Sequence, residues 1–283
     1  VLCLFWGATG LNCFGMRISA AFSSISAIIG TLAPMLLIIG LGSHWLWLDQ
    51  PTAISLSWES FWPHQEDLHN LAFFSTILFG LLGIEMSAVH ADDIKQPNTT
   101  YPKAILLSTV VILGTLVLSS LAIALVVPSH QLSVINALTQ AFTTILNAHH
   151  LHWLLPVVGF MIILSGLGNV SAWIIGPTKG VLMAAQDGNL PLKWTTTNKH
   201  QVPTTILVIQ CLIFTGLCSI FIFMPSIESG YWVLTAMTAQ MGLTYYAILF
   251  ATALRLRKKH PDQHRAFQIP GGKIGMACTA GLG

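Results

Sequence analysis

Long apolar runs separated by short polar segments dominate the hydropathy pattern of the chain. Six of them each approach the ~20 residues that a helix needs to cross a bilayer core of ~30 Å, and they lie at about 19–42, 71–90, 104–127, 154–176, 204–224 and 231–253. Residues 1–11 form the end of another apolar run, and residues 272–283 form the start of one more. The pattern predicts an all-α polytopic membrane protein, with a single transmembrane domain over residues 1–283 that is truncated at both ends.

Composition supports the same environment. Charged residues make up 8% of the 283 residues and apolar residues 54%, whereas soluble domains are usually about one quarter charged. With so little polar material the chain cannot cover a water-facing surface, so we expect the lipid bilayer to surround it. The formal net charge of +2 excludes a nucleic-acid partner.

The positions of the basic residues predict an orientation, because Lys and Arg accumulate in cytoplasmic loops. All 12 fall on alternate connections, and none lies in the connections at about 43–70, 128–153 and 225–230. We therefore expect those three connections to face outward, in a multi-pass protein of the cell inner (plasma) membrane. Seven histidines lie in them: His44, His64, His69, His130, His149, His150 and His152. They could sense acidic surroundings by becoming charged below about pH 6.5, or they could simply keep the loops hydrophilic.

One carboxylate interrupts the apolar runs. Glu85 lies about two thirds of the way through the 71–90 run, shortly after Gly80 and Gly83. An ionisable group at bilayer depth costs at least ~2.5 kcal/mol, and each glycine weakens a helix by about 1 kcal/mol. The combination predicts an unwound stretch whose backbone groups line a substrate cavity. The alternative is a small-residue packing face, with Glu85 bonded to a neighbouring helix.

Two further runs contain polar side chains. Asn169 and Trp173 are four residues apart, so they share one helix face; this face could offer an amide and an aromatic lid to a substrate, or it could be a packed seam of small residues. Tyr245 and Tyr246 lie centrally in the 231–253 run, where an interhelical hydrogen bond is the more frequent role.

Three motifs give the chain a resemblance. They are FGLLGIEMSA at 79–88 followed by ADDIKQP at 91–97, SAWIIGPTKG at 171–180, and HPD at 260–262 continuing to IPGGK at 269–273. The sequence resembles the amino acid, polyamine and organocation transporter superfamily, and within it the bacterial glutamate/GABA antiporter family. The resemblance covers essentially all 283 residues. It implies a leucine-transporter-like fold of two inverted repeats, of which this chain would hold about helix 4 to helix 11 of twelve.

The resemblance also implies roles for single residues. Phe79 matches the aromatic gate of the sixth helix, the stretch from Gly80 through Gly83 and Ile84 to Glu85 includes its unwound turn, and Trp173 matches the aromatic substrate contact of the eighth. Tyr246 matches a pathway tyrosine of the tenth helix. Two positions depart from the exchangers: Asn169 replaces an acidic residue, and Gly242 replaces a second pathway tyrosine. Exchange of glutamate for GABA therefore does not follow automatically.

The expected function is secondary active transport of an amino acid, such as glutamate, GABA or a related amino acid, by exchange around the broken sixth helix. A proton-coupled amino acid or amine permease of the same superfamily is the alternative. A membrane enzyme using outward groups such as His149 and Glu66 is a distant one, because the sequence has no HExxH motif. We expect no cofactor, no metal site and no enzymatic activity. A passive channel is disfavoured because no run carries a polar stripe.

Overall fold

The computed structural model describes residues 2–55, 57, 77, 80, 82–128, 136–219, 226–260, 262–263, 269, 271–272, 274–276 and 278. Across these residues the regular structure is helical, without a strand. Within the described residues, four helical segments are long and apolar enough to cross a membrane: Arg17–Trp47, Pro97–Val126, His152–Gln186 and Ile227–Lys259. The prediction of an all-α polytopic membrane protein is confirmed.

The chain divides into two compact units. The first comprises Val1–Trp62 and Ser108–Met224, and the second comprises Pro63–Leu107 and Pro225–Gly283. Helix α5 (Pro97–Val126) has residues in both.

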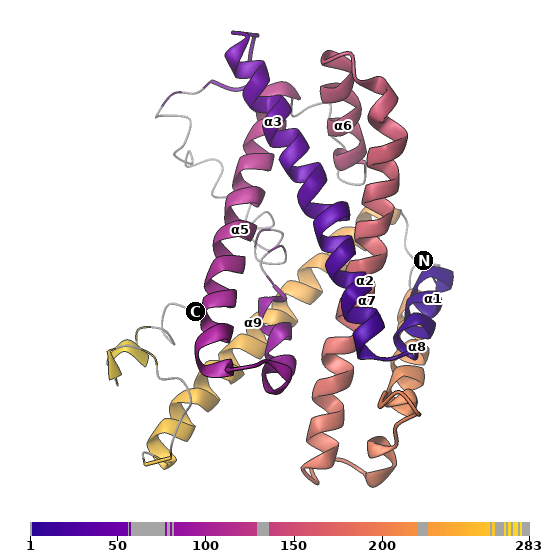
Figure 1. The fold of residues 1–283 in the computed structure, drawn as a ribbon, viewed down its shortest axis with the longest axis vertical. Coiled ribbons are helices and arrows are strands. Elements are labelled where there is room, and N and C mark those ends of the chain that lie inside the picture. The colour runs from indigo at the N-terminus through magenta and orange to yellow at the C-terminus, as the bar shows by residue number, and fades with distance from the viewer. Residues whose placement is uncertain are drawn as a thin grey trace. The chain divides into compact units, whose positions relative to one another are not determined.

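The first unit begins with α1 (Leu2–Asn12) and then a long interrupted helix. That helix runs from α2 (Met16–Ile25) through a π-helical segment, η1 (Ser26–Leu32), into α3 (Ala33–Trp47). It packs on α7 (Leu155–Gln186), and α1 packs on α7 and on α8 (Thr204–Ser219) (Figure 1). Two short 3-10 helices, η6 (His152–Leu154) and η7 (Leu192–Thr195), flank α7.

Small residues set the distance between η1 and α7. A Cβ added to Gly30 would lie 2.6 Å from the backbone nitrogen of Ser165, and one added to Gly168 would overlap the Ser26 side chain. The Thr31 and Ser165 hydroxyls are hydrogen bonded at 2.7 Å, and the Ser23 hydroxyl donates to the Gly168 carbonyl. Close backbone approach with hydroxyl hydrogen bonds is the usual way in which membrane helices associate.

One helix lies where the sequence predicts only an outward connection. Helix α6 (Ala137–Ala148) falls within the 128–153 segment and buries one face, formed by Ala141, Phe142, Ile145 and Leu146. These side chains share a core with Ile38 of α3, Ala122 of α5 and Val158 of α7. The spacing i, i+1, i+4, i+5 is typical of one face of a helix. Because the connection contains no charged residues, the opposite face of this helix does not stand out in the sequence.

The second unit contains the 3-10 helix η4 (Ile84–Asp93), the start of α5, and α9 (Ile227–Lys259). The Ser226 hydroxyl caps α9 by accepting from the Ser229 backbone N–H at 3.1 Å. Glu228 lies in the first turn of α9, while Arg257, Lys258 and Lys259 lie in its last turn. Both placements complement the helix dipole.

Candidate substrate site

The chain leaves α-helical geometry at the glycine pair. Ile77 and Gly80 are α-helical, Leu82 and Gly83 form a turn, and η4 begins at Ile84. Gly83 has φ +115°, which side chains with a Cβ rarely adopt. Gly80 has no positive φ, and a Cβ there would meet nothing within 4 Å. Of the two glycines, Gly83 is the one that the local backbone requires.

Glu85 closes this turn through its side chain. Its Oε2 atom accepts the backbone N–H of Gly83 at 3.0 Å and the hydroxyl of Tyr246 at 2.7 Å. The second bond joins residues 161 positions apart and fastens the turn to α9. A short hydrogen bond to a carboxylate is of the stronger, charge-assisted kind, so the carboxylate is oriented before any ligand arrives.

Gly242 makes room for the turn one helical turn before Tyr246. A Cβ on Gly242 would lie 2.7 Å from Cδ2 of Leu82, so Leu82 occupies the space beside α9 at this position. From the sequence, Gly242 was notable only as a departure from the exchanger pattern. Gly242 therefore has a packing role, because a tyrosine side chain at this position would overlap Leu82 in its present place.

Ser87 and Tyr101 were not predicted as part of the site. Their hydroxyls are hydrogen bonded at 3.0 Å, and the Ser87 hydroxyl also donates to the Ile84 carbonyl at 2.8 Å. These contacts tie η4 to the beginning of α5. Tyr101 is the first residue of the Tyr-Pro pair that follows the acidic motif, and its position after that motif is the signal that could have identified it.

The predicted site residues fall in two places. Gly80, Gly83, Ile84, Glu85 and Tyr246 belong to the second unit, and the hydrogen bonds bring Gly83, Glu85 and Tyr246 together. Asn169 and Trp173 lie on one exposed face of α7 in the first unit, with Trp173 42% exposed. Phe79 lies outside the described residues. The packed seam of α7 is formed by Ser165 and Gly168, whereas Asn169 is exposed.

Membrane-spanning helices together with a carboxylate held at a helix interruption define a helical membrane protein of the transporter class. The chain belongs to the amino acid permease family, whose model matches residues 1–283. It is 47% identical over 283 residues to an uncharacterized transporter of Legionella pneumophila, covering all of this chain and 61% of that protein. A glutamate/gamma-aminobutyrate antiporter of Lactococcus lactis is 28% identical over 286 residues, covering all of this chain and 57% of the relative.

A relative of lower sequence identity is named for different substrates. A probable agmatine/putrescine antiporter of Lactococcus lactis is 25% identical over 206 residues, covering 72% of this chain and 44% of that protein. The chain thus spans about 60% or less of the length of these curated relatives. The resemblance drawn from the motifs is confirmed at the level of the family, and the family consists of transporters, not enzymes.

Proposed function

We propose that the protein is a secondary active amino acid transporter, and specifically an antiporter of the glutamate/GABA exchanger type. The observation that carries the proposal is the Glu85 carboxylate, held by Gly83 and Tyr246 at a turn within an otherwise apolar segment. The antiporter names of two relatives, at 28% and 25% identity, support exchange. Because those names differ in substrate, the particular amino acid is the least constrained part of the proposal.

In this mechanism the turn supplies the polar groups of the substrate site. Among the described residues, both hydrogen bonds of the Glu85 carboxylate go to Oε2, which leaves Oε1 to receive a substrate ammonium group. Backbone groups around Gly83 and Ile84 add dipoles where the regular helical bonding is interrupted. The family resemblance adds Phe79, Gly80, Asn169 and Trp173 to the expected substrate contacts, and their roles stay predictions. A rocking of helix bundles then exposes the substrate alternately to each side.

Glu85 also favours a second candidate function, a proton-coupled amino acid or amine permease. A carboxylate within a membrane-spanning segment is a common proton carrier. Protonation would weaken its attraction for a substrate ammonium group and for the Tyr246 hydroxyl, so proton binding and substrate binding would be linked.

Uptake into proteoliposomes of the full-length protein separates the two candidates. Labelled glutamate, GABA and other amino acids are supplied to vesicles that are either empty or preloaded with unlabelled amino acid. Exchange requires much faster uptake into preloaded vesicles, whereas a proton-coupled permease fills empty vesicles when the interior is made alkaline. Equal uptake into preloaded and empty vesicles, without an imposed gradient, would overturn the antiporter.

The proposed location is the cell inner membrane, with the Lys- and Arg-bearing connections in the cytoplasm. Single cysteines introduced at Lys199 and at His152, in a background without native cysteines, including the five of this chain, report the side of each connection. A membrane-impermeant thiol reagent applied outside intact cells should label His152→Cys and leave Lys199→Cys unlabelled. The reverse labelling would invert the orientation.

A further inference from the structure

A histidine pair lies at the end of the first unit that the loop charges predict to face outward. The ring of His149, the C-cap residue of α6, lies 5.3 Å from the ring of His44 near the end of α3. Trp45 contacts the same His149 ring edge-on, with centroids 5.7 Å apart. The Trp45 indole is itself fixed, because its N–H donates to the Pro51 carbonyl at 3.2 Å. The pair therefore joins two helices that are far apart in sequence.

The surroundings of His149 favour a neutral ring. Its Nε2 atom is buried and has no hydrogen-bond partner within the described part of the chain. A neutral imidazole can leave this nitrogen as a lone pair, whereas an imidazolium carries a proton on both ring nitrogens. A proton added at Nε2 would be buried without an acceptor and would face a second histidine.

We propose that the contact between neutral His149 and His44 latches α6 onto α3, and that protonation of His149 under acidic conditions releases α6. The latch would act whichever substrate is transported. Of the seven histidines in connections predicted to face outward, it involves only His44 and His149.

The surroundings of His149 offer little to stabilise an added charge. Among the described residues, the titratable groups at this end of the unit are His44, His150, His152 and Asp49. The α5 residues in this unit and residues 155–178 of α7 contain no Asp, Glu, Lys, Arg or His. Burial lowers the pKa of His149, and repulsion from His44 and His150 lowers it further, against the opposing effect of the Leu41 backbone.

The direction of the pH effect follows from this lowered pKa. In released α6 the histidine would return to its ordinary pKa of about 6.5. The latch is therefore at full strength above about pH 6.5, and it weakens as the pH falls from there through the lower pKa of the latched state. Acid releases α6, and neutral pH restores the contact.

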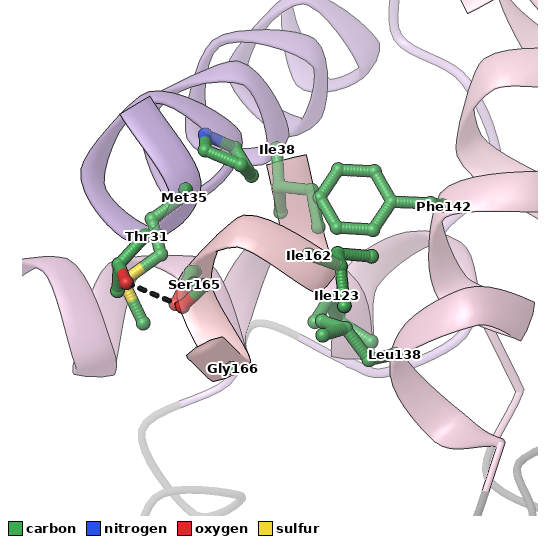
Figure 2. Close-up of a pocket in the computed structure, with 12 residues that line it drawn as sticks. Thr31, Met35, Ile38, Ile123, Leu138, Phe142, Ile162, Ser165 and Gly166 are labelled. Atoms are coloured by element: carbon green, nitrogen blue, oxygen red, sulfur yellow. Dashed lines mark hydrogen bonds between the residues drawn. The ribbon is translucent and has the colours of Figure 1, made fainter. Parts of the chain in front are cut away.

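Release of α6 would open an apolar cavity. The cavity has a volume of about 300 Å³ and lies among α3, α5, α6 and α7. Figure 2 shows Ile38 of α3 beside the Phe142 ring of α6, Leu138 next to Ile123, and Met35 near the Thr31–Ser165 hydrogen bond. Because Phe142 also belongs to the core of the first unit, movement of α6 changes packing against α3, the continuation of η1. A change of charge at His149 is thereby converted into a change of helix packing.

Hydrogen exchange of the full-length protein in nanodiscs tests the latch. Amide exchange in residues 137–148 is compared at about pH 7.5 and about pH 5.5, after correction for the intrinsic effect of pH on exchange. Because latching lowers the pKa of His149, we expect severalfold faster corrected exchange of α6 at the lower pH, with α8 unchanged.

Three variants separate the latch from general acid sensitivity. His149→Gln should abolish the acid-induced acceleration of α6 exchange, and His44→Gln should reduce it. His150→Gln, which changes the exposed neighbouring residue, should leave most of the acceleration. An absence of acceleration in the unmodified protein would overturn the proposal, as would the same acceleration in α8 or in His149→Gln. Should His149→Gln fail to fold, His44→Gln decides: an undiminished acceleration there overturns the latch.

Discussion

Glycine serves different purposes in the two units. At the contact between η1 and α7, Gly30 and Gly168 lack a Cβ because another helix occupies that space. At the turn before η4, Gly83 is required by its own backbone, with φ +115°. The first arrangement brings apolar helices together, whereas the second interrupts a helix and presents Glu85. A glycine in a membrane segment can thus serve packing or chain direction, and its backbone conformation and neighbouring atoms distinguish the two roles.

The largest expected effect is on the packed contact. Gly30→Ala places a Cβ 2.6 Å from the Ser165 backbone nitrogen and 2.8 Å from the Met161 carbonyl oxygen, and backbone cannot move aside as a side chain can. Overpacking of this kind costs about 1–3 kcal/mol. We expect a clearly lower unfolding temperature in detergent. Gly166→Ala is the matched control on α7, because nothing lies within 4 Å of its added Cβ; equal stability of the two variants would contradict the packing role.

The next effect separates Gly83 from Gly80. Alanine at Gly83 must adopt a disfavoured positive φ, at a cost of order 1–3 kcal/mol, and the strain falls on the turn that carries Glu85. Gly80→Ala has open space and ordinary helical geometry, so it should preserve uptake or improve stability slightly. We expect proteoliposome uptake to fall severalfold more in Gly83→Ala than in Gly80→Ala. Similar losses in both would favour a packing face over a required turn.

The fold could be predicted from the sequence to a large extent, because bilayer thickness fixes the length of each apolar run and the 8% charge leaves no other environment. Helix α6 was missed, since its buried face of four residues is too short to stand out in an uncharged connection. At the site, Glu85 is conspicuous as a carboxylate among apolar residues. Its bond to Tyr246 could not be predicted from the residues, because periodicity does not indicate which helices adjoin across 161 positions.

A smaller effect is expected at Tyr246. Tyr246→Phe removes one of the two hydrogen bonds to Glu85 Oε2, and a bond to a charged group contributes about 1.5–3 kcal/mol. Much of that can be recovered by a substrate or water bonding to the carboxylate, so we expect roughly a tenfold fall in uptake with little loss of stability. Tyr245→Phe is the adjacent control, since Tyr245 is 49% exposed. Equal uptake by both variants would show that Tyr246 does not contribute to the substrate site.

The smallest effect is expected at Gly242, although its geometry resembles that of Gly30. An added Cβ would lie 2.7 Å from Cδ2 and 2.8 Å from Cδ1 of Leu82; these atoms are the end of a flexible side chain, which can rotate away. Alanine also favours the helix by about 1 kcal/mol relative to glycine. The cost of displacing the Leu82 side chain and the gain in helix stability nearly cancel, so Gly242→Ala should change the unfolding temperature far less than Gly30→Ala. A loss as large as that of Gly30→Ala would mean that Leu82 is held rigidly, and that the turn before Glu85 is as tightly packed as the contact between η1 and α7.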